Sequence, residues 1–293
     1  MASFRLLLVS SFLLAACSSV TPEPVAEGPD AAPANGPDQT SSCQGDGNDL
    51  VYVVDADHRL LSFDPRKVGG SDPFSLVGQL DCPAGTSWPG LGGDAATPFS
   101  MSVDRQGNAW VLYSSGELFK VSTSDATCVA SNFTPGQKGF ELFGMGFVSD
   151  AAGSEAETLY VAGGPAAALT SGDLGTINTN DMLLSNLGAI SAGEQNPEMT
   201  GTGEGELYGF FPGFLSNFIA RLDKNTGAVL EQGDLSATSG SVAAWAFAHW
   251  GGQFYRFITD DDINTGSSTS QVKDYDPATG SDSTAVAPSQ YRV

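Results

Sequence analysis

The chain has 293 residues and is strongly acidic, with 34 Asp and Glu against 12 Lys and Arg and a formal net charge of −22 at pH 7. Nucleic-acid phosphates bind clustered Lys and Arg side chains, so nucleic acid is a poor partner for this chain and none is expected. Because the carboxylates are dispersed along the chain, we attribute the acidity to solubility at a cell surface or to adaptation to salty surroundings. Binding of divalent cations is the alternative.

The first 16 residues have the organisation of a signal peptide. Arg5 precedes the apolar run Leu6–Leu14, which is too short to cross a bilayer as a permanent helix. The run ends in Leu-Ala-Ala-Cys17, which resembles the lipobox of bacterial lipoproteins. The resemblance implies export, cleavage before Cys17, lipidation of its thiol and attachment to a membrane, and Ser18 in place of Asp favours the outer membrane. The alternative is an ordinary secretory signal with an incidental cysteine.

The composition changes sharply after the cysteine. Residues 18–42 are mainly Ser, Thr, Pro, Ala, Gly and acidic residues, without a single aromatic side chain. Such a sequence cannot bury enough apolar surface to offset its ordering entropy. We therefore expect residues 17–42 to be the lipidated cysteine and a disordered tether, and residues 43–293 to be one folded domain.

The clearest structural signal is the stretch from Phe99 to Val121, which predicts three strands joined by two tight turns. Phe99–Val103 alternates apolar and polar residues, and Trp110–Tyr113 is rich in aromatic and β-branched side chains. Asp104–Asn108 and Ser114–Gly116 supply the turns. Such a meander cannot bury both faces alone, so it requires copies of itself packed alongside.

Related strands recur along the chain at a spacing typical of propeller repeats. Third strands are expected at Leu60–Pro65, Leu118–Thr123, Leu174–Thr179, Ile219–Lys224 and Val272–Pro277. Second strands are expected at Val51–Val54, Ala109–Tyr113, Thr158–Val161, Glu206–Phe210 and Gln253–Phe257. First strands are expected at Phe99–Val103, Phe143–Val148, Glu198–Thr202 and Ala244–His249.

These units resemble β-propellers of the group with NHL, SMP-30-like and two-component-regulator repeats, most clearly over Ser102–Val111. We therefore predict an all-β fold, a single β-propeller of five four-stranded blades; six blades or an incompletely closed ring is the alternative. The first unit has no upstream strand, because Cys43–Asn48 is polar and rich in Gly. Ala285–Val293 is the candidate to close the ring.

An exported protein with three cysteines besides Cys17 is expected to contain one disulfide. Cys82 and Cys128 each fall next to the expected last strand of consecutive repeats, so they are the predicted pair. Cys43 remains; it is expected to be free, bridged to another chain, or paired with a cysteine of a C-terminal extension.

The other candidate sites are weakly specified by the sequence. Asp260, Asp262 and Asn264 resemble the start of a calcium loop, although Gly266 comes one place late and Gln271 replaces the bidentate Glu. A solvated loop is the alternative, and no cofactor other than calcium is expected. Trp245, His249 and Trp250 are candidates for ligand binding near the propeller axis, with packing between blades as the alternative.

Two functions from different classes remain open on the sequence. Sparse histidines and the absence of a recognisable catalytic motif favour a surface-anchored, non-catalytic propeller that binds a protein or polysaccharide. The alternative is a carbohydrate-active hydrolase with acidic residues at the axis, for which Asp104, Glu141, Asp150 and Glu198 are the inner-strand candidates. Convergence of carboxylates in one axial cavity would distinguish the two.

Overall fold

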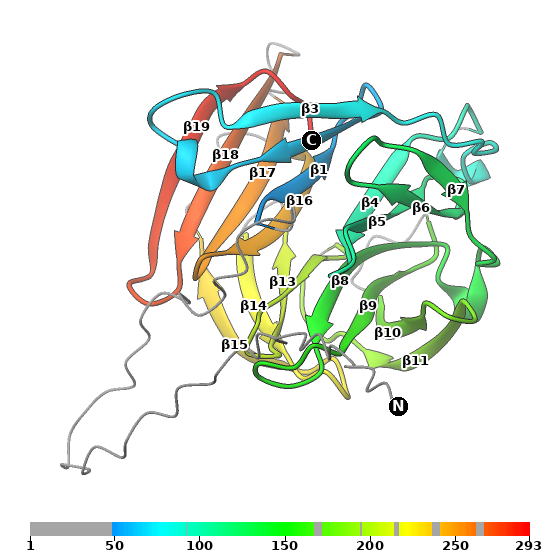
Figure 1. Cartoon of the computed structure of the whole chain (residues 1–293). Helices are drawn as coiled ribbons and strands as arrows, with labels where there is room; N and C mark the ends of the chain where they lie inside the picture. The colour runs from blue at the N-terminus through cyan, green and yellow to red at the C-terminus, as the bar shows by residue number, and fades with distance from the viewer. Residues whose placement is uncertain are drawn as a thin grey trace, which may run out of the picture. The chain divides into compact units, whose positions relative to one another are not determined.

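The computed structural model describes residues 49–293 except 92, 167–171, 194, 214–216, 236–240 and 262–266. Strands and three short 3-10 helices make up the regular structure of these residues (Figure 1). None of the helices in the described ranges has the length and apolar character needed to span a membrane.

The strands form five antiparallel sheets, here called blades 1 to 5. Blade 1 contains β1 (Val51–Val54), β2 (Arg59–Phe63) and β3 (Phe74–Gln79). Blade 2 contains β4 (Pro98–Val103), β5 (Asn108–Tyr113), β6 (Leu118–Ser122) and β7 (Cys128–Ala130). Blade 3 contains β8 (Leu142–Ser149), β9 (Glu157–Gly164), β10 (Asp173–Asn178) and β11 (Leu183–Ala189). Blade 4 contains β12 (Glu198–Gly201), β13 (Leu207–Phe211), β14 (Phe218–Leu222) and β15 (Val229–Asp234). Blade 5 contains β16 (Ser241–Trp250), β17 (Gln253–Asp261), β18 (Ser268–Asp276) and β19 (Ser281–Ser289).

The blades stand around a central axis, as Figure 1 shows, and the fold is a five-bladed β-propeller. Blades 2 to 5 each have four strands paired in chain order, and the first strands β4, β8, β12 and β16 approach one another at the axis. Blade 1 has three strands among the described residues. The prediction of an all-β, five-bladed propeller is confirmed.

Apolar side chains between neighbouring blades form the core. Leu112 of blade 2 packs with Phe143 and Val161 of blade 3, and the other interfaces repeat this arrangement. The second strands β5 and β17 are buried along almost their whole length because they lie between two neighbours. Burial at these interfaces supplies the stability that a single meander lacks.

The turn after β4 shows how local sequence sets the blade geometry. The Asp104 carboxylate accepts hydrogen bonds from the N–H groups of Gln106 and Asn108, at 3.0 and 2.8 Å. Gly107 has a φ of 76°, a backbone conformation that residues other than Gly rarely adopt. The Asp-x-x-Gly-Asn sequence therefore closes the hairpin between β4 and β5, as expected from the sequence.

In blade 1, β1 has the position and direction of a second strand. It begins beside the end of β16, where the Trp250 Nε1–H donates to the Asp49 carbonyl at 2.8 Å. It ends near the start of β4, because Val54 and Phe99 line the same cavity. It thus runs opposite to the first strands. β3 is partly exposed after the buried Phe74, like the outer strands of the other blades. The place of a first strand in blade 1 holds no strand among the described residues.

The prediction that Ala285–Val293 supplies this strand is wrong. Most of the segment belongs to β19, where Val286 pairs with Val272 of β18 as the outer strand of blade 5. The tight turn at Asp276–Gly280, closed by a 2.8 Å bond from the Gly280 N–H to the Asp276 carbonyl, returns the chain directly alongside β18. Only the end of the chain reaches blade 1, where the Arg292 carbonyl accepts from the Ala56 N–H at 2.8 Å.

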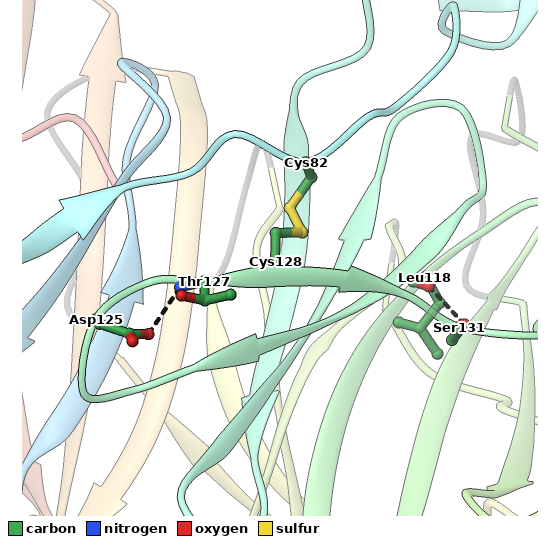
Figure 2. Close-up of a disulfide and its surroundings, with 6 residues drawn as sticks. All are labelled: Cys82, Leu118, Asp125, Thr127, Cys128 and Ser131. Atoms are coloured by element: carbon green, nitrogen blue, oxygen red, sulfur yellow. Dashed lines mark hydrogen bonds between the residues drawn. A yellow bond between two sulfur atoms is a disulfide. The ribbon is translucent and has the colours of Figure 1, made fainter.

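The predicted disulfide between Cys82 and Cys128 is confirmed (Figure 2). The two Cα atoms lie 5.3 Å apart, and the bond joins residues 46 positions apart in sequence. The Thr127 N–H donates to Asp125 before β7, and the Ser131 hydroxyl donates to the Leu118 carbonyl after it. Both ends of β7 are thereby held, which places Cys128 opposite Cys82 and links blade 2 to blade 1. Cys17 and Cys43 lie outside the described residues.

Candidate functional site: the axial cavities

Two cavities meet at the propeller axis and share one wall. The larger has a volume of about 510 Å³ and opens among the first residues of β4, β8 and β12. The smaller, of about 300 Å³, lies between β16, β1 and β4. Phe99, Glu198 and Trp245 line both. These three side chains define the candidate site, which we call the axial site.

Glu198 supplies the carboxyl group of the axial site. It is the first residue of β12 and is 8% exposed. One of its oxygens, Oε2, accepts a hydrogen bond from the Ser100 hydroxyl of β4 at 2.9 Å. Main-chain N–H groups of Met145 and Met199 donate to the same carboxyl. The group therefore receives bonds from three first strands, which fixes it at the axis.

Burial raises the pKa of the Glu198 carboxyl from 4.5 to about 8, although the hydrogen bonds it accepts act in the opposite direction. The side chain is therefore largely uncharged at neutral pH. A protonated carboxyl can donate a hydrogen bond as well as accept one, so the axial site can bind a neutral ligand without holding an unpaired charge.

Glycines in β8 bring Glu198 this close to its partners. A Cβ at Gly144 would overlap the carbonyl oxygen of Pro197, and one at Gly146 would overlap the main chain of Met199. The spacing Gly-Met-Gly therefore lets β8 and β12 approach closely while Met145 packs away from the axis in the core. This approach allows the Met145 N–H to reach the carboxyl.

The larger cavity adds aromatic, apolar and amide groups to the axial site. Phe99 is 42% exposed and Leu91 is 43% exposed, although both are large apolar side chains. Trp245 is half-buried, and Asn196 and Gln195 lie just before β12. Asn196 accepts from the Gly172 N–H through its side-chain oxygen at 2.8 Å, so its amide nitrogen is the group it can offer a ligand.

The structure separates the three residues predicted to bind a ligand. Trp245 lines both axial cavities, whereas His249 and Trp250 lie at the far end of β16. The His249 ring packs against Phe254 with centroids 5.1 Å apart, and Trp250 bonds to the main chain before β1. Of the three, Trp245 has the position that ligand binding at the axis requires.

The predicted calcium residues fall partly outside the described ranges. Asp260 is a buried residue of β17, and its Oδ2 accepts from the Gln271 amide at 2.8 Å. Burial raises the pKa of the Asp260 carboxyl. Asp262 and Asn264 lie outside the described residues, so the calcium site stays a prediction. Within residues 49–293, omitting the gaps given above, no cluster of three or more His, Cys, Asp or Glu has the arrangement to hold a metal ion.

Of the four acidic candidates for catalysis, only Glu198 lines an axial cavity. Asp104 caps its turn and accepts from the Trp110 indole, and Glu141 accepts from the Ala166 N–H at 2.8 Å. The other carboxylate in a cavity wall is Asp55, which forms an ion pair with Arg59 at 2.6 Å. The sequence near Glu198 does not distinguish it from the other three acidic candidates, because the residues around its carboxyl come from strands far apart in the chain.

No family model matches the chain, and no curated protein matches it. Several solved structures resemble the fold. They include hydrazine synthase of Kuenenia stuttgartiensis, with a TM-score of 0.42 and 14% identity over 80% of this chain and 62% of that one. The α-L-arabinofuranosidase CtGH43 of Clostridium thermocellum has a TM-score of 0.47 and 15% identity over 68% of this chain and 76% of that one. The endo-arabinase of Bacteroides thetaiotaomicron has a TM-score of 0.45 and 14% identity over 66% of this chain and 80% of that one.

This chain spans less than two thirds of the hydrazine synthase chain. Propellers of the GH43 hydrolases are thus among the structures it resembles, but likeness at this level carries no argument about its activity or ligand.

Proposed function

We propose that the protein is an exported, lipid-anchored β-propeller that binds a neutral polysaccharide at the axial site without cleaving it. The observation that carries this proposal is the shared wall of the two cavities, where an uncharged Glu198 carboxyl meets the rings of Phe99 and Trp245. The lipobox-like sequence ending at Cys17 and the tether that follows support localisation to the outer membrane.

The chemistry of sugars fits this set of groups. A pyranose or furanose ring has an apolar face that stacks on an aromatic side chain, and its hydroxyls exchange hydrogen bonds with amide and carboxyl groups. Trp245 and Phe99 supply the aromatic surface, and Asn196 and Glu198 supply donors and acceptors. An uncharged carboxyl also avoids the cost of desolvating an unpaired anion when a neutral ligand excludes water.

A hydrolase is the second candidate, because a carboxyl with a raised pKa is suited to act as a general acid. Glycoside hydrolysis needs a second carboxylate, about 5 to 10 Å from the first, as nucleophile or base. Asp55 is the other acidic residue in the cavity walls, and its pairing with Arg59 makes it a poor base. The non-catalytic function is therefore the better supported of the two.

The test is affinity electrophoresis of the mature protein in gels containing soluble arabinan, xylan or mixed-linkage glucan. We expect retardation by at least one of them, weakened about tenfold or more in Trp245→Ala, because loss of one stacking ring costs about 1 to 3 kcal/mol. Trp250→Phe is the matched control, since Trp250 lies outside both cavities, and it should bind like the wild type. Binding that is equal in Trp245→Ala and the wild type would place the ligand elsewhere.

The same mixtures decide between binding and hydrolysis. We expect no release of reducing ends on prolonged incubation. Release by the wild type that is lost in Glu198→Gln would establish a hydrolase and overturn the non-catalytic proposal.

A further inference from the structure

The bonds that Glu198 already makes determine what its carboxyl can offer a ligand. A carboxyl group has about four lone-pair positions on its two oxygens. The Ser100 hydroxyl and the main-chain N–H groups of Met145 and Met199 take three of these positions. Burial raises the pKa of the carboxyl to about 8, so at neutral pH the fourth position carries a proton. Glu198 therefore has an O–H donor left for a ligand.

Asn196 is left with donors as well. It lies two positions before Glu198 and lines the larger cavity with it. Its side-chain oxygen accepts from the Gly172 N–H at 2.8 Å, which leaves the N–H groups of its amide nitrogen. The neighbouring Gln195 lines the same cavity, and its amide can both donate and accept, as sugar hydroxyls require. Glu198 and Asn196 are thus two donors that match a ligand group able only to accept.

A carbonyl oxygen is a group of this kind. It has two lone pairs and no hydrogen, so it can accept from Glu198 and Asn196 together. A sugar hydroxyl in the same place could accept, but its own O–H would need an acceptor that neither residue has left, and a buried donor without a partner is costly. Unsubstituted neutral polysaccharides carry hydroxyl and ether oxygens, so the carbonyl has to belong to a substituent.

The smaller cavity adjoins Glu198 and suits the apolar part of such a substituent. Its wall includes six small or apolar side chains: Val54, Pro98, Met101, Ala244, Ala246 and Ala248. Of its polar side chains, Ser100 is bonded to Glu198, Asp55 is paired with Arg59, and Arg292 is exposed. A sugar ring placed against the apolar wall would lose hydrogen bonds of its hydroxyls, whereas burial of a methyl group there is favourable.

We propose that the axial site recognises an acetyl group on a sugar ring of its polysaccharide ligand. The ring stacks on Trp245 and Phe99 in the larger cavity, and the acetyl carbonyl accepts from Glu198 and Asn196. The acetyl methyl enters the smaller cavity. This preference rests on the proposed binding of a neutral polysaccharide and names the feature that the site selects. O-acetyl esters and N-acetyl amino sugars carry the same group, and both leave the ligand neutral.

The test is isothermal titration calorimetry of the mature protein with two matched pairs of oligosaccharides. One pair is mono-O-acetylated xylotetraose and xylotetraose; the other is chitotetraose and cellotetraose, which has a hydroxyl in place of each acetamido group. We expect the acetylated member of at least one pair to bind about tenfold more tightly or better, because the other member lacks two hydrogen bonds and a buried methyl group. Preference within the first pair alone identifies an ester, and within the second alone an amide.

The variant Asn196→Asp tests whether the preference arises at the axial site. Asp has nearly the same size and can still accept from the Gly172 N–H, but it offers an acceptor where Asn offers donors. We expect the affinities within a pair to become nearly equal. Asn178→Asp is the matched control and should keep the wild-type preference. Asn178 is exposed outside both cavities, and its oxygen likewise accepts a main-chain N–H, that of Asn180, at 3.0 Å.

No preference for the acetylated member of either pair would overturn the proposal. A preference that persists in Asn196→Asp would also overturn it, because the acetyl group would then bind elsewhere. If Asn196→Asp does not fold, judged by near-ultraviolet circular dichroism, the wild-type comparison of the two pairs still decides. The proposed function fails separately, when the wild type is retarded by none of the polysaccharides and binds no oligosaccharide of either pair.

Discussion

Replacing Glu198 by Gln should remove a pH-dependent destabilisation of the propeller. Burial raises the pKa of this carboxyl from 4.5 to about 8 in the folded protein. Between these values the folded state keeps a proton that the unfolded state releases, so stability is complete below about pH 4.5 and falls as the pH rises through the folded-state pKa. Each unit of difference between the folded and unfolded pKa values corresponds to about 1.36 kcal/mol. The free energy of unfolding should therefore fall by roughly 5 kcal/mol at most between pH 4.5 and pH 8.

Gln preserves the size of the side chain and its hydrogen bonds. Its oxygen can accept from the N–H groups of Met145 and Met199, and its amide nitrogen can donate to the Ser100 hydroxyl. We therefore expect Glu198→Gln to match the wild type in free energy of unfolding near pH 4.5. At pH 8 it should be more stable by several kcal/mol.

The assay is urea unfolding followed by tryptophan fluorescence at a series of pH values from 4.5 to 8.5. Glu155→Gln is the control, because Glu155 is exposed and outside the axial cavities. It should leave the pH profile of stability unchanged. A constant difference between Glu198→Gln and the wild type across the series would refute the reasoning, since it would mean that the Glu198 carboxyl does not titrate differently on folding.

Three further changes have defined outcomes. Tyr113→Phe should leave the free energy of unfolding unchanged or raise it by roughly 1 kcal/mol, because the Tyr113 hydroxyl is buried without a hydrogen-bond partner among the described residues. Thermal or urea unfolding measures this, and a decrease in stability of more than about 1 kcal/mol would show that the hydroxyl is hydrogen-bonded. Replacing Cys82 and Cys128 together by Ser should cost about 2 to 4 kcal/mol in urea unfolding, since the disulfide closes a loop of 46 positions, and an unchanged midpoint would contradict this. Cys17→Ser should abolish lipid labelling and leave an uncleaved precursor or a released protein in cell fractions; a mature, membrane-bound product would show that Cys17 is not the anchor.

The blades were predictable from the sequence because each strand carries its own signal. Alternation in Phe99–Val103, the Asp104 turn and the recurring third strands all depend on residues close together in the chain. Cys82 and Cys128 could be paired because each lies next to an outer strand of consecutive blades, and the structure brings their Cα atoms to 5.3 Å.

The axial site was less predictable for a physical reason. Glu198 became identifiable only when β4, β8 and β12 met around it, and nothing within the sequence near Glu198 records that Ser100 and Met145 will be its partners. The position of Ala285–Val293 at the end of the chain suggests that it closes the ring, but this prediction is wrong. The pairing of Val286 with Val272 within blade 5 decided its place instead.

The most direct test of ligand binding at the axial site is the NMR spectrum of the tryptophan indole N–H groups during titration with an oligosaccharide of the retained polysaccharide. We expect the Trp245 resonance to shift with increasing ligand, because Trp245 lines both axial cavities. The Trp110 resonance should stay in place, since that indole donates to the buried Asp104 carboxylate at 3.1 Å. A saturating titration in which Trp245 does not move while another tryptophan does would contradict the assignment of the axial site.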